Sequence, residues 1–413
     1  MAHNKSYICV IPHLKDFLDD LEPRESPLVP GLVKGESGEI VGFMPKISFV
    51  PAGSFVLAEK LYENYEQLIN GLKFKRSGPS REIYFDPPRT KAAIVTCGGL
   101  CPGLNVVIRE LVMCMWFNYG VRQIYGVKWG YRGFYENFPE HWIELKPSVV
   151  SHIHDAGGTI LGSSRGGFDG EKIIKALLDQ GVEMLFCIGG DGTHRGVNAL
   201  AEIINARKLK IALVGVPKTI DNDIPILDKS FGFDTATEIS EKMVEAATNE
   251  AIAAQNGIGL VKVMGRHAGF IAQNAALASR EVNFCLVPEI PFELFGENGL
   301  YECVLRHLAK HNHAVIVVAE GADTAVLDHP EKKEEVKKDA SGNVQHSDIG
   351  VFLKKGIVDY GKSKGIEITL KYIDPTYAIR SVQANSGDTI LCTRLAHAAV
   401  HSAMAGHTMF SVG

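Results

Sequence analysis

The sequence predicts an α/β protein of two domains with mainly parallel sheets, preceded by an accessory segment at the N-terminus. The first observation is the order of elements, because from Lys91 onward apolar strands are followed by glycine turns and then by helices. The second is that these strands are continuous apolar runs, which is typical of sheets covered on both faces. The third is the length of 413 residues with 46% hydrophobic residues, which is enough for two domain cores.

The elements of the two domains are expected in a fixed order along the chain. In the first domain we expect strands at 92–96, 184–188 and 211–216, and helices at 105–117 and 193–205. In the second we expect helices at 234–255 and 298–311, and strands at 258–264, 282–287, 314–319 and 366–372. A last helix near 387–405 should return to the first domain. We therefore assign 91–232 and 379–413 to a first domain and 233–378 to a second domain.

Three stretches fall outside this alternation. Residues 1–90 are rich in proline, charge and turn signals, and only 54–72 reads as helical, so we expect a segment packed on or wrapped around the main body. The charged segment 330–348 favours a solvated surface loop, with a regulatory or interface loop as the alternative. The chain ends soon after Gly406, which suggests that a final strand or tail is missing.

Composition excludes several classes of protein. The net charge of −5 argues against a broad basic surface for nucleic acid. No apolar run approaches the roughly 18 residues of a membrane span, and the N-terminus has no signal-peptide pattern, so we expect a cytoplasmic protein. Several of the eight cysteines lie in apolar runs and should be buried. Cys97 and Cys101 have no second ligand pair nearby, which does not favour a zinc site.

The motif GGDGT at 189–193 follows the second strand of the first domain. Glycines there let backbone N–H groups face a phosphate, with the positive N-terminus of the next helix behind them. Asp191 adds a carboxylate where a magnesium ion would bridge protein and nucleotide. The alternative is an ordinary tight turn with an aspartate cap. The motif alone indicates phosphoryl transfer without naming the acceptor.

The motif PKTIDND at 217–223 places two carboxylates, a lysine and a threonine directly after a buried strand. A kinase needs a base within reach of the acceptor hydroxyl and cations around the transferred group. We therefore expect Asp221 to be the base, Asp223 to orient it or touch the metal, and Lys218 to meet phosphate as a point charge. Acidic surface turns are common, but they rarely follow a buried strand and a proline.

Further candidates also lie near strand ends. Arg266 follows the apolar strand that ends in VMG, although an arginine there is also an ordinary surface residue. Glu320 follows the strand VVA, and its carboxylate can accept bonds from sugar hydroxyls. Arg380 follows the strand at 366–373 and can hold a sugar phosphate by charge-assisted bonds. The glycine-rich loops at 98–103 and 157–166 are weak indications of nucleotide contact.

Taken together, these residues resemble the phosphofructokinase family. The match runs from about 91 to 406 in the expected order, through CGGLCPGLN, GYRGF, GGTILGSSRGG, IGGDGT, PKTIDND, GFDTA, VMGR, AEG and YAIR. The segment FDPPRTKAAIVTCGGLCPGLN is most similar to the plant and protist branch, whose members include ATP-dependent enzymes. The resemblance implies two facing, three-layer Rossmann-like domains, namely a nucleotide-binding domain at 91–232 and 379–413 and a sugar-phosphate-binding domain at 233–378. It also implies transfer of a phosphoryl group to the 1-hydroxyl of fructose 6-phosphate in glycolysis.

The resemblance also implies roles for particular residues. Asp221 would be the proton acceptor, and Arg266 would stabilise the transferred group, with Thr219, Lys218 and Asp223 beside them. The positions implied to bind ATP are Gly99, Tyr131, Arg165, Gly166, Gly190, Asp191, Gly192, Thr193 and Gly196, with Asp191 also on Mg²⁺. The positions implied to bind the sugar phosphate are Thr219, Ile220, Asp221, Met264, Gly265, Arg266, Glu320, Lys371, Tyr377, Ala378, Ile379 and Arg380. An allosteric homotetramer or a dimer is expected.

The phosphoryl donor can be argued from two positions. Diphosphate-dependent relatives have an aspartate where this chain has Gly192, and its carboxylate would repel the α-phosphate of a nucleotide. They also have a lysine where this chain has Lys218, but that charge suits either donor. We therefore expect ATP, with a diphosphate-dependent enzyme as the alternative.

Departures from bacterial relatives suggest a rebuilt pocket for the sugar phosphate. Gly257 and Lys371 stand where those enzymes have arginines, and Leu100 replaces a carboxylate. Two remoter alternatives remain. A NAD or lipid kinase would explain GGDGT but not the later motifs. A non-catalytic regulatory subunit would be expected to lose Asp221 or Arg266, and both are present.

Overall fold

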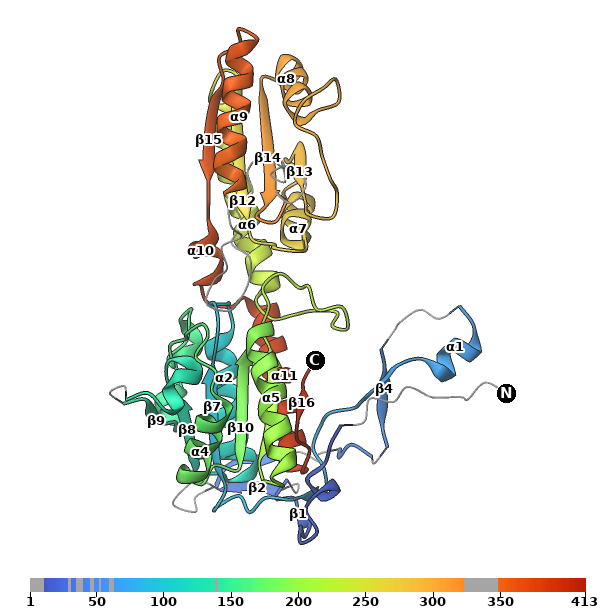
Figure 1. Ribbon diagram of the computed structural model, residues 1–413, viewed down its shortest axis with the longest axis vertical. Coiled ribbons are helices and arrows are strands. Elements are labelled where there is room, and N and C mark those ends of the chain that lie inside the picture. Colours follow the sequence, from blue (N-terminus) through green and yellow to red (C-terminus); the bar gives the residue numbers. More distant parts are fainter. Residues whose placement is uncertain are drawn as a thin grey trace.

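The computed structural model describes residues 11–28, 31–34, 40–44, 48–51, 53–58, 63–137, 140–322 and 348–413. Two α/β units lie one above the other along the long axis, and the N-terminal segment projects from the side of the lower unit (Figure 1). The charged segment at 330–348 lies outside the described residues except for Asp348. The predicted α/β class with mainly parallel sheets is confirmed.

The lower unit is built on a six-stranded sheet in the order β16-β11-β10-β7-β8-β9. Its strands are β7 (Lys91–Thr96), β8 (Gln123–Val127), β9 (Trp142–Glu144), β10 (Met184–Gly189), β11 (Ala212–Pro217) and β16 (Phe410–Ser411). All neighbours are parallel except β8 and β9. At one edge of the sheet β16, close to the end of the given sequence, pairs in parallel with β11.

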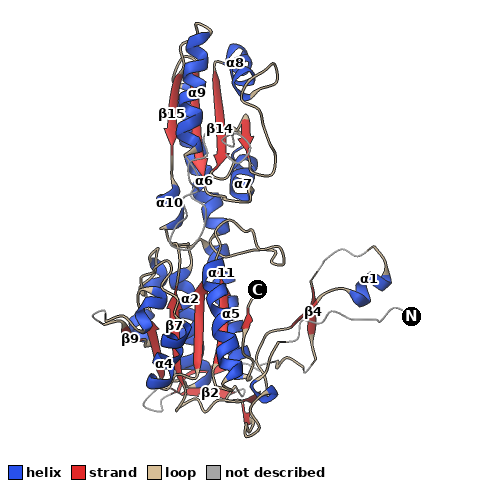
Figure 2. Cartoon of the chain, in the orientation of Figure 1, coloured by secondary structure: helices blue, strands red, loops and turns tan. Residues whose placement is uncertain are grey.

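Helices cover both faces of this sheet, which gives three layers (Figure 2). One core contains Ile94, Phe186 and Val214 from the strands, together with residues of α2 (Leu104–Met113) and α11 (Ser386–Met404). The other contains their neighbours Ala93, Leu185 and Leu213, with residues of α4 (Gly170–Gln180) and α5 (Asp191–Ala206). Successive strand residues thus enter opposite cores, and this is why the strands are apolar throughout.

The upper unit has a four-stranded parallel sheet in the order β13-β14-β12-β15. Its strands are β12 (Gly257–Val263), β13 (Phe284–Leu286), β14 (His313–Ala319) and β15 (Thr369–Ile373). Residues of α8 (Leu300–His311) and α9 (Ile349–Ser363) form the core on one face. The helices α6 (Phe233–Ile252) and α7 (Phe270–Ser279) pack on each other and contribute to the core of the other face. The short helix α10 (Thr376–Arg380) leads back to the lower unit. The domain limits given above stay a prediction.

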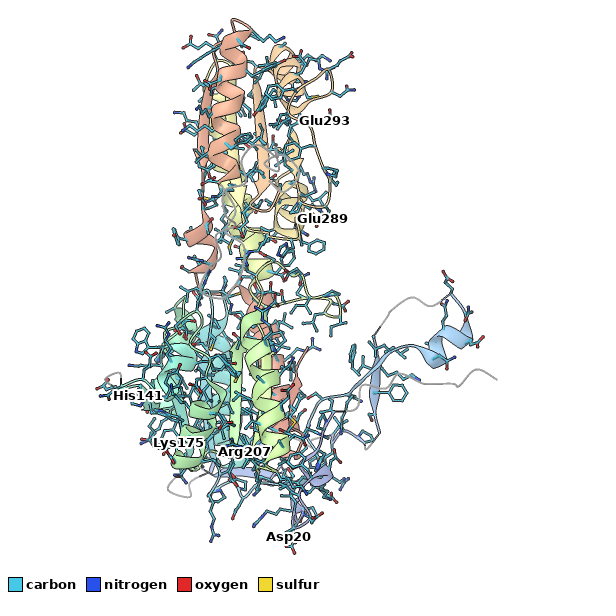
Figure 3. The ribbon with its side chains drawn as sticks, viewed as in Figure 1. Asp20, His141, Lys175, Arg207, Glu289 and Glu293 are labelled. Atoms are coloured by element: carbon cyan, nitrogen blue, oxygen red, sulfur yellow. The ribbon has the colours of Figure 1, made fainter. Side chains whose placement is uncertain are left out.

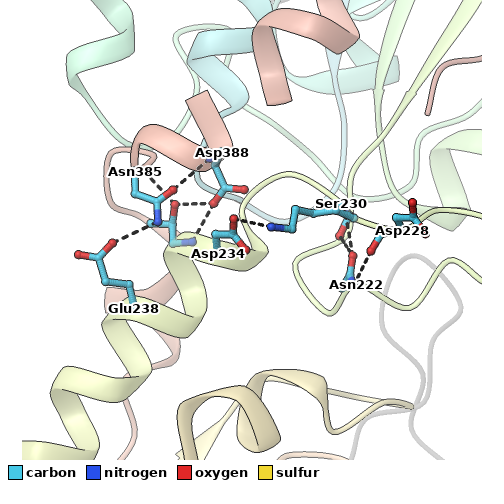
Figure 4. Close-up of polar contacts among 9 residues, drawn as sticks. Asn222, Asp228, Ser230, Asp234, Glu238, Asn385 and Asp388 are labelled. Atoms are coloured by element: carbon cyan, nitrogen blue, oxygen red, sulfur yellow. Dashed lines mark hydrogen bonds and ion pairs between the residues drawn. The ribbon is translucent and has the colours of Figure 1, made fainter. Parts of the chain in front are cut away.

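The two units are joined where the N-termini of α6 and α11 meet (Figure 4). The cap of α6 is Gly232, which has no side chain to bind the first N–H groups. Asp388 of α11 supplies the acceptor, because its Oδ2 accepts from Thr235 N at 2.8 Å and from Thr235 Oγ1 at 2.6 Å. Asn385 also donates to Glu238 at 3.1 Å. These bonds fix the first turn of α6 against α11.

The N-terminal segment differs from the prediction of one helix at 54–72. Residues Phe55–Leu57 form β4, which pairs with β5 (Lys73–Lys75), and only Tyr65–Asn70 is helical, as α1. The aromatic and β-branched side chains of Phe55 and Val56 favour a strand, and Asn64 caps a helix that begins only after it. The outer part projects from the body (Figure 1), whereas Leu14 and Leu28 are buried in the main core.

Short elements complete this segment. They are a 3-10 turn (Leu14–Asp16), β1 (Arg24–Glu25) paired with β6 (Glu82–Ile83), and β2 (Gly31–Lys34) paired with β3 (Ile40–Met44). Leu14, Leu28 and Ile83 belong to the main core, so these parts of the segment pack on the body, whereas the extent of the accessory segment stays a prediction.

Candidate active site

A cavity of about 340 Å³ lies where the carboxyl ends of the two parallel sheets meet. Loops after β7, β10 and β11 line it from the lower unit, and the loop after β12 and Arg380 line it from the upper side. Carboxyl ends of parallel strands meet at one edge of a sheet, and this edge is where α/β proteins bind ligands.

The GGDGT motif forms the turn between β10 and α5. A Cβ on Gly189 would lie within 2.1 Å of Thr193 Oγ1, so only glycine fits there. The helix begins at Asp191, and its backbone turns at once, with Thr193 N donating to Gly190 O at 2.9 Å. Gly190 to Thr193 all line the cavity. The first N–H groups of α5, those of Asp191 and Gly192, thus stand at the cavity wall, as phosphate binding requires.

The PKTIDND motif is a loop held rigidly by its own polar side chains. Thr219 Oγ1 donates to Asp223 Oδ1 at 2.7 Å and accepts from Asp221 N at 3.3 Å. Asn222 adopts φ of 56°, a left-handed conformation that asparagine tolerates. Its side chain accepts from Ser230 N at 2.7 Å and donates to Asp228 O at 3.4 Å (Figure 4). The loop therefore presents Asp221 in one fixed orientation.

Asp221 bridges the two sides of the cavity. Its Oδ2 accepts from the backbone N–H of Arg266 at 3.2 Å, whereas its Oδ1 is buried and has no hydrogen-bond partner. Burial raises the pKa of Asp221 to about 7, the negative charges of Asp223 and Glu320 act in the same direction, and the bond from Arg266 opposes them. A carboxylate with a free oxygen and a pKa near neutrality is suited to accept a proton.

Among the residues that the structure describes, five cationic side chains line the cavity, namely Arg165, Arg195, Lys218, Arg266 and Arg380. Two of their guanidinium groups converge on Gly99, because a Cβ there would lie 3.8 Å from Arg165 Nη2 and 4.0 Å from Arg380 Nη1. Lys218 is buried, which lowers its pKa, and the charge of Arg165 lowers it further. The Nε of Arg380 is buried without a partner. Cations held this closely together indicate a polyanionic ligand.

Most of the predicted residues come together in this cavity. From the nucleotide set these are Gly99, Tyr131, Arg165, Gly166, Gly190, Asp191, Gly192 and Thr193. From the reaction and sugar-phosphate sets they are Lys218, Thr219, Ile220, Asp221, Asp223, Met264, Arg266 and Arg380. They come from segments more than 200 residues apart in the sequence.

Other predicted residues do not line the cavity, and these are Gly196, Gly265, Glu320, Lys371, Tyr377, Ala378 and Ile379. A Cβ on Gly196 would lie 2.9 Å from the ring of Tyr131, so Gly196 makes room for a lining residue. Glu320 acts on Asp221 through its charge. Tyr377 is 74% exposed, and its ring lies 4.8 Å from the guanidinium carbon of Arg380.

Lys371 lies farther away from the cavity. It pairs with Gly259 in the sheet, four residues before the end of β12, and its Nζ lies 3.7 Å from Glu250 Oε2. Gly257 leaves no room for a side chain, since a Cβ would lie 2.0 Å from Ala251 O. In this fold, the arginine that bacterial relatives have here would have no space.

The structure adds lining residues that the sequence did not single out, namely Cys97, Phe168, Arg195 and His267. Arg195 lies two residues beyond GGDGT and His267 directly follows VMGR. Only their proximity to these motifs could have indicated from the sequence that they line the cavity. Phe168 packs edge-on against Tyr131, with ring centroids 5.3 Å apart, and had no sequence signal.

Comparisons with known proteins indicate one family. Residues 91–403 match the family model described as Phosphofructokinase. The chain is 47% identical to ATP-dependent 6-phosphofructokinase 7 of Arabidopsis thaliana, over 98% of this chain and 80% of that protein. It is 48% identical to ATP-dependent 6-phosphofructokinase of Borreliella burgdorferi, over 93% of this chain and 85% of that protein.

A solved structure with a similar fold is a pyrophosphate-dependent phosphofructokinase from Marinobacter aquaeolei. The TM-score is 0.62, with 21% identity over 77% of each chain. At this identity the likeness concerns the fold alone.

Proposed function

Because this chain belongs to the phosphofructokinase family, we propose that its cavity transfers a phosphoryl group from ATP to the 1-hydroxyl of fructose 6-phosphate. The products are fructose 1,6-bisphosphate and ADP. The protein is a kinase with an alcohol acceptor, and its reaction is a step of glycolysis. The observation that carries the proposal is the buried, unpartnered Oδ1 of Asp221 in a cavity lined by cations.

The lower unit is the side that we propose for ATP. The first turn of α5 and the loop at Gly99 would bind its phosphates through backbone N–H groups. Arg165 and Lys218 would offset the negative charge of the transferred phosphoryl group. This matters because catalysis of phosphoryl transfer depends almost entirely on positioning and on electrostatic stabilisation. Tyr131 holds the α5 turn from behind, because its hydroxyl donates to Thr193 O at 2.8 Å.

The loop between Thr219 and Asp223 and the loop after β12 are the side that we propose for the sugar phosphate. Asp221 Oδ1 takes the proton of the acceptor hydroxyl as the new P–O bond forms. Arg266 lines the same cavity, and its guanidinium offsets the negative charge of the phosphoryl group during transfer. Arg380 is the proposed partner of the sugar's own phosphate. Glu320, Lys371 and Tyr377 stay proposed substrate contacts that do not line the cavity in this chain.

The cavity residues also fit a magnesium ion. Asp191 in the first turn of α5 and Asp223 in the loop after β11 both line the cavity with carboxylates, and Mg²⁺ is usually held by one or two carboxylates plus nucleotide phosphates. We propose Asp191 as the protein ligand. When bound, the ion would offset the negative charge of the nucleotide phosphates.

The donor is tested by steady-state assays with ATP and with diphosphate at saturating fructose 6-phosphate. We expect turnover with ATP, and turnover with diphosphate alone would overturn the proposal. Gly192→Asp should lower kcat/KM for ATP by at least about tenfold, because a carboxylate would face nucleotide phosphate in the cavity. Asn198→Asp is the matched control, since it adds the same charge to an exposed position of α5 that does not line the cavity.

The oligomeric assembly and the cellular location of the chain are also proposals. We propose a homotetramer or a dimer in the cytoplasm. Within the described part of the chain, no helix combines the length and the apolar character that crossing a membrane requires. Sedimentation of the full chain would measure the assembly, and a monomer that is fully active would contradict the proposal.

A further inference from the structure

A second cluster of reactive side chains lies away from the cavity, between the end of α2 and α11. Cys114, His397 and His401 each present one ligand atom, and these atoms lie within 4.8 Å of one another. His397 and His401 are one turn apart on α11, so both face the same side. Cys114 and His401 are buried, and His397 is partly exposed. None of the three lines the cavity described above.

The neighbours of this cluster also suit a metal. Glu110 lies one turn before Cys114, and its Oε2 lies 3.5 Å from His397 Nε2. Tyr119 Oη lies 2.7 Å from His401 Nδ1, which holds that ring and leaves its Nε2 as the ligand atom. Metal-binding histidines usually have such a partner on the second ring nitrogen. The cluster therefore has an acidic partner beside His397 and an orienting tyrosine on His401.

The backbone of the α2 segment is unusual at the same place. The α-helix ends at Met113 and continues as a π-helix over Cys114–Tyr119. π-helical turns are rare and occur often at functional sites. This one begins at the cysteine of the cluster and ends at the tyrosine that contacts His401. The irregular turn thus carries both Cys114 and Tyr119.

We propose that Cys114, His397 and His401 bind a divalent metal of the zinc type, with Glu110 beside them as the charged partner of His397. A thiolate with two imidazoles suits Zn²⁺ and does not suit Mg²⁺, which prefers oxygen ligands. On binding, the Cys114 thiol gives up its proton to the buffer and a metal–sulfur bond forms. Ligand atoms of a tetrahedral zinc site are about 3.5 Å apart, given bond lengths of about 2.0 to 2.3 Å. The ligands must therefore draw together, and the partly exposed His397 can move to do so.

Such a metal would fix α2 to α11. Because Asp388 at the start of α11 also holds the first turn of α6, the metal would stabilise a helix that joins both units. Its role is structural and separate from the magnesium proposed at Asp191.

The test uses the full-length chain after treatment with a chelator. Titration with CoCl₂ should show that one equivalent of Co²⁺ binds, with the visible bands of tetrahedral Co²⁺ and a thiolate charge-transfer band. Addition of ZnCl₂ should displace the bound Co²⁺. Cys114→Ser and His397→Ala should each weaken binding by at least about tenfold. His397 is partly exposed, so its variant keeps the test informative even where Cys114→Ser fails to fold.

A matched control is available on α8. Cys303, His307 and His311 repeat the same residue types at one-turn spacing, but on a single helix and outside any ligand cluster found among the described residues. Cys303→Ser should leave Co²⁺ binding unchanged. A Co²⁺ spectrum without the thiolate band, or variants at 114 and 397 that bind as tightly as the unchanged chain, would overturn the proposal. Equal losses in the Cys303 variant would overturn it as well.

Discussion

The protonation of Asp221 should control the pH dependence of the reaction. Its pKa is raised to about 7, and the carboxylate must be ionised to accept the hydroxyl proton. At one pH unit below that value only about a tenth of the enzyme carries the base in its active form. We therefore expect kcat/KM to fall about tenfold for each pH unit below about 7.

A single substitution separates the charge of Asp223 from its hydrogen bond. In Asp223→Asn the amide oxygen can still accept a hydrogen bond from Thr219 Oγ1, which lies 2.7 Å from Asp223 Oδ1 in the unsubstituted chain. Only the negative charge is lost, and that charge raises the pKa of Asp221. The pKa of Asp221 should therefore fall. The acid limb of the pH profile should move with it to lower pH, by about half to one pH unit.

The assay is kcat/KM for fructose 6-phosphate across this pH range at saturating ATP. The sugar phosphate itself titrates near pH 6, but it does so equally for both enzymes, so the difference between them reports on Asp221. Glu171→Gln is the control, because Glu171 pairs with Arg207, which lies at the end of α5 far from the cavity (Figure 3). An acid limb that stays in place in Asp223→Asn would refute the assignment of Asp221 as the titrating base.

Two further predictions concern stability and are measured by denaturant unfolding. Asp388→Ala should cost about 1–3 kcal/mol, because it leaves Thr235 N without its acceptor at the junction of the two units; an unchanged midpoint would contradict this role. Gly103→Ala should cost about 1–3 kcal/mol more than Gly120→Ala. Both glycines have positive φ, but a Cβ at 103 would lie 2.6 Å from Cys392 Sγ, whereas the space at 120 is open. Equal losses would show that only the backbone matters.

The strand-end motifs could be predicted from the sequence because their chemistry is local. GGDGT and PKTIDND each follow a buried strand, and parallel strands bring their carboxyl ends together whatever the details of the loops. The two motifs therefore meet in one cavity, as expected. Arg195 and His267 were missed because only the direction of a helical turn or loop decides whether a side chain faces the cavity.

Residues placed by sheet register were harder to predict. Lys371 is level with Gly259 in the β12–β15 pair, and the strand end at Val263 is four residues, or about 13 Å, further on. Nothing in the sequence fixes that register. The helix expected at 54–72 was wrong for a different reason, because β4 gains its partner from β5, well along the chain. Local sequence patterns do not predict pairing between strands so far apart in the chain.

The most direct test of the account is the turnover of Asp221→Ala. Removing the carboxylate deletes the proton acceptor but leaves the phosphate-binding cations and the α5 turn in place. We expect kcat with ATP and fructose 6-phosphate to fall by about 10²–10⁴-fold. Equilibrium binding of fructose 6-phosphate should change by less than about threefold, since Arg380 and the loop after β12 remain. A variant that retains kcat within about tenfold of the unchanged enzyme would contradict the central claim that Asp221 is the base.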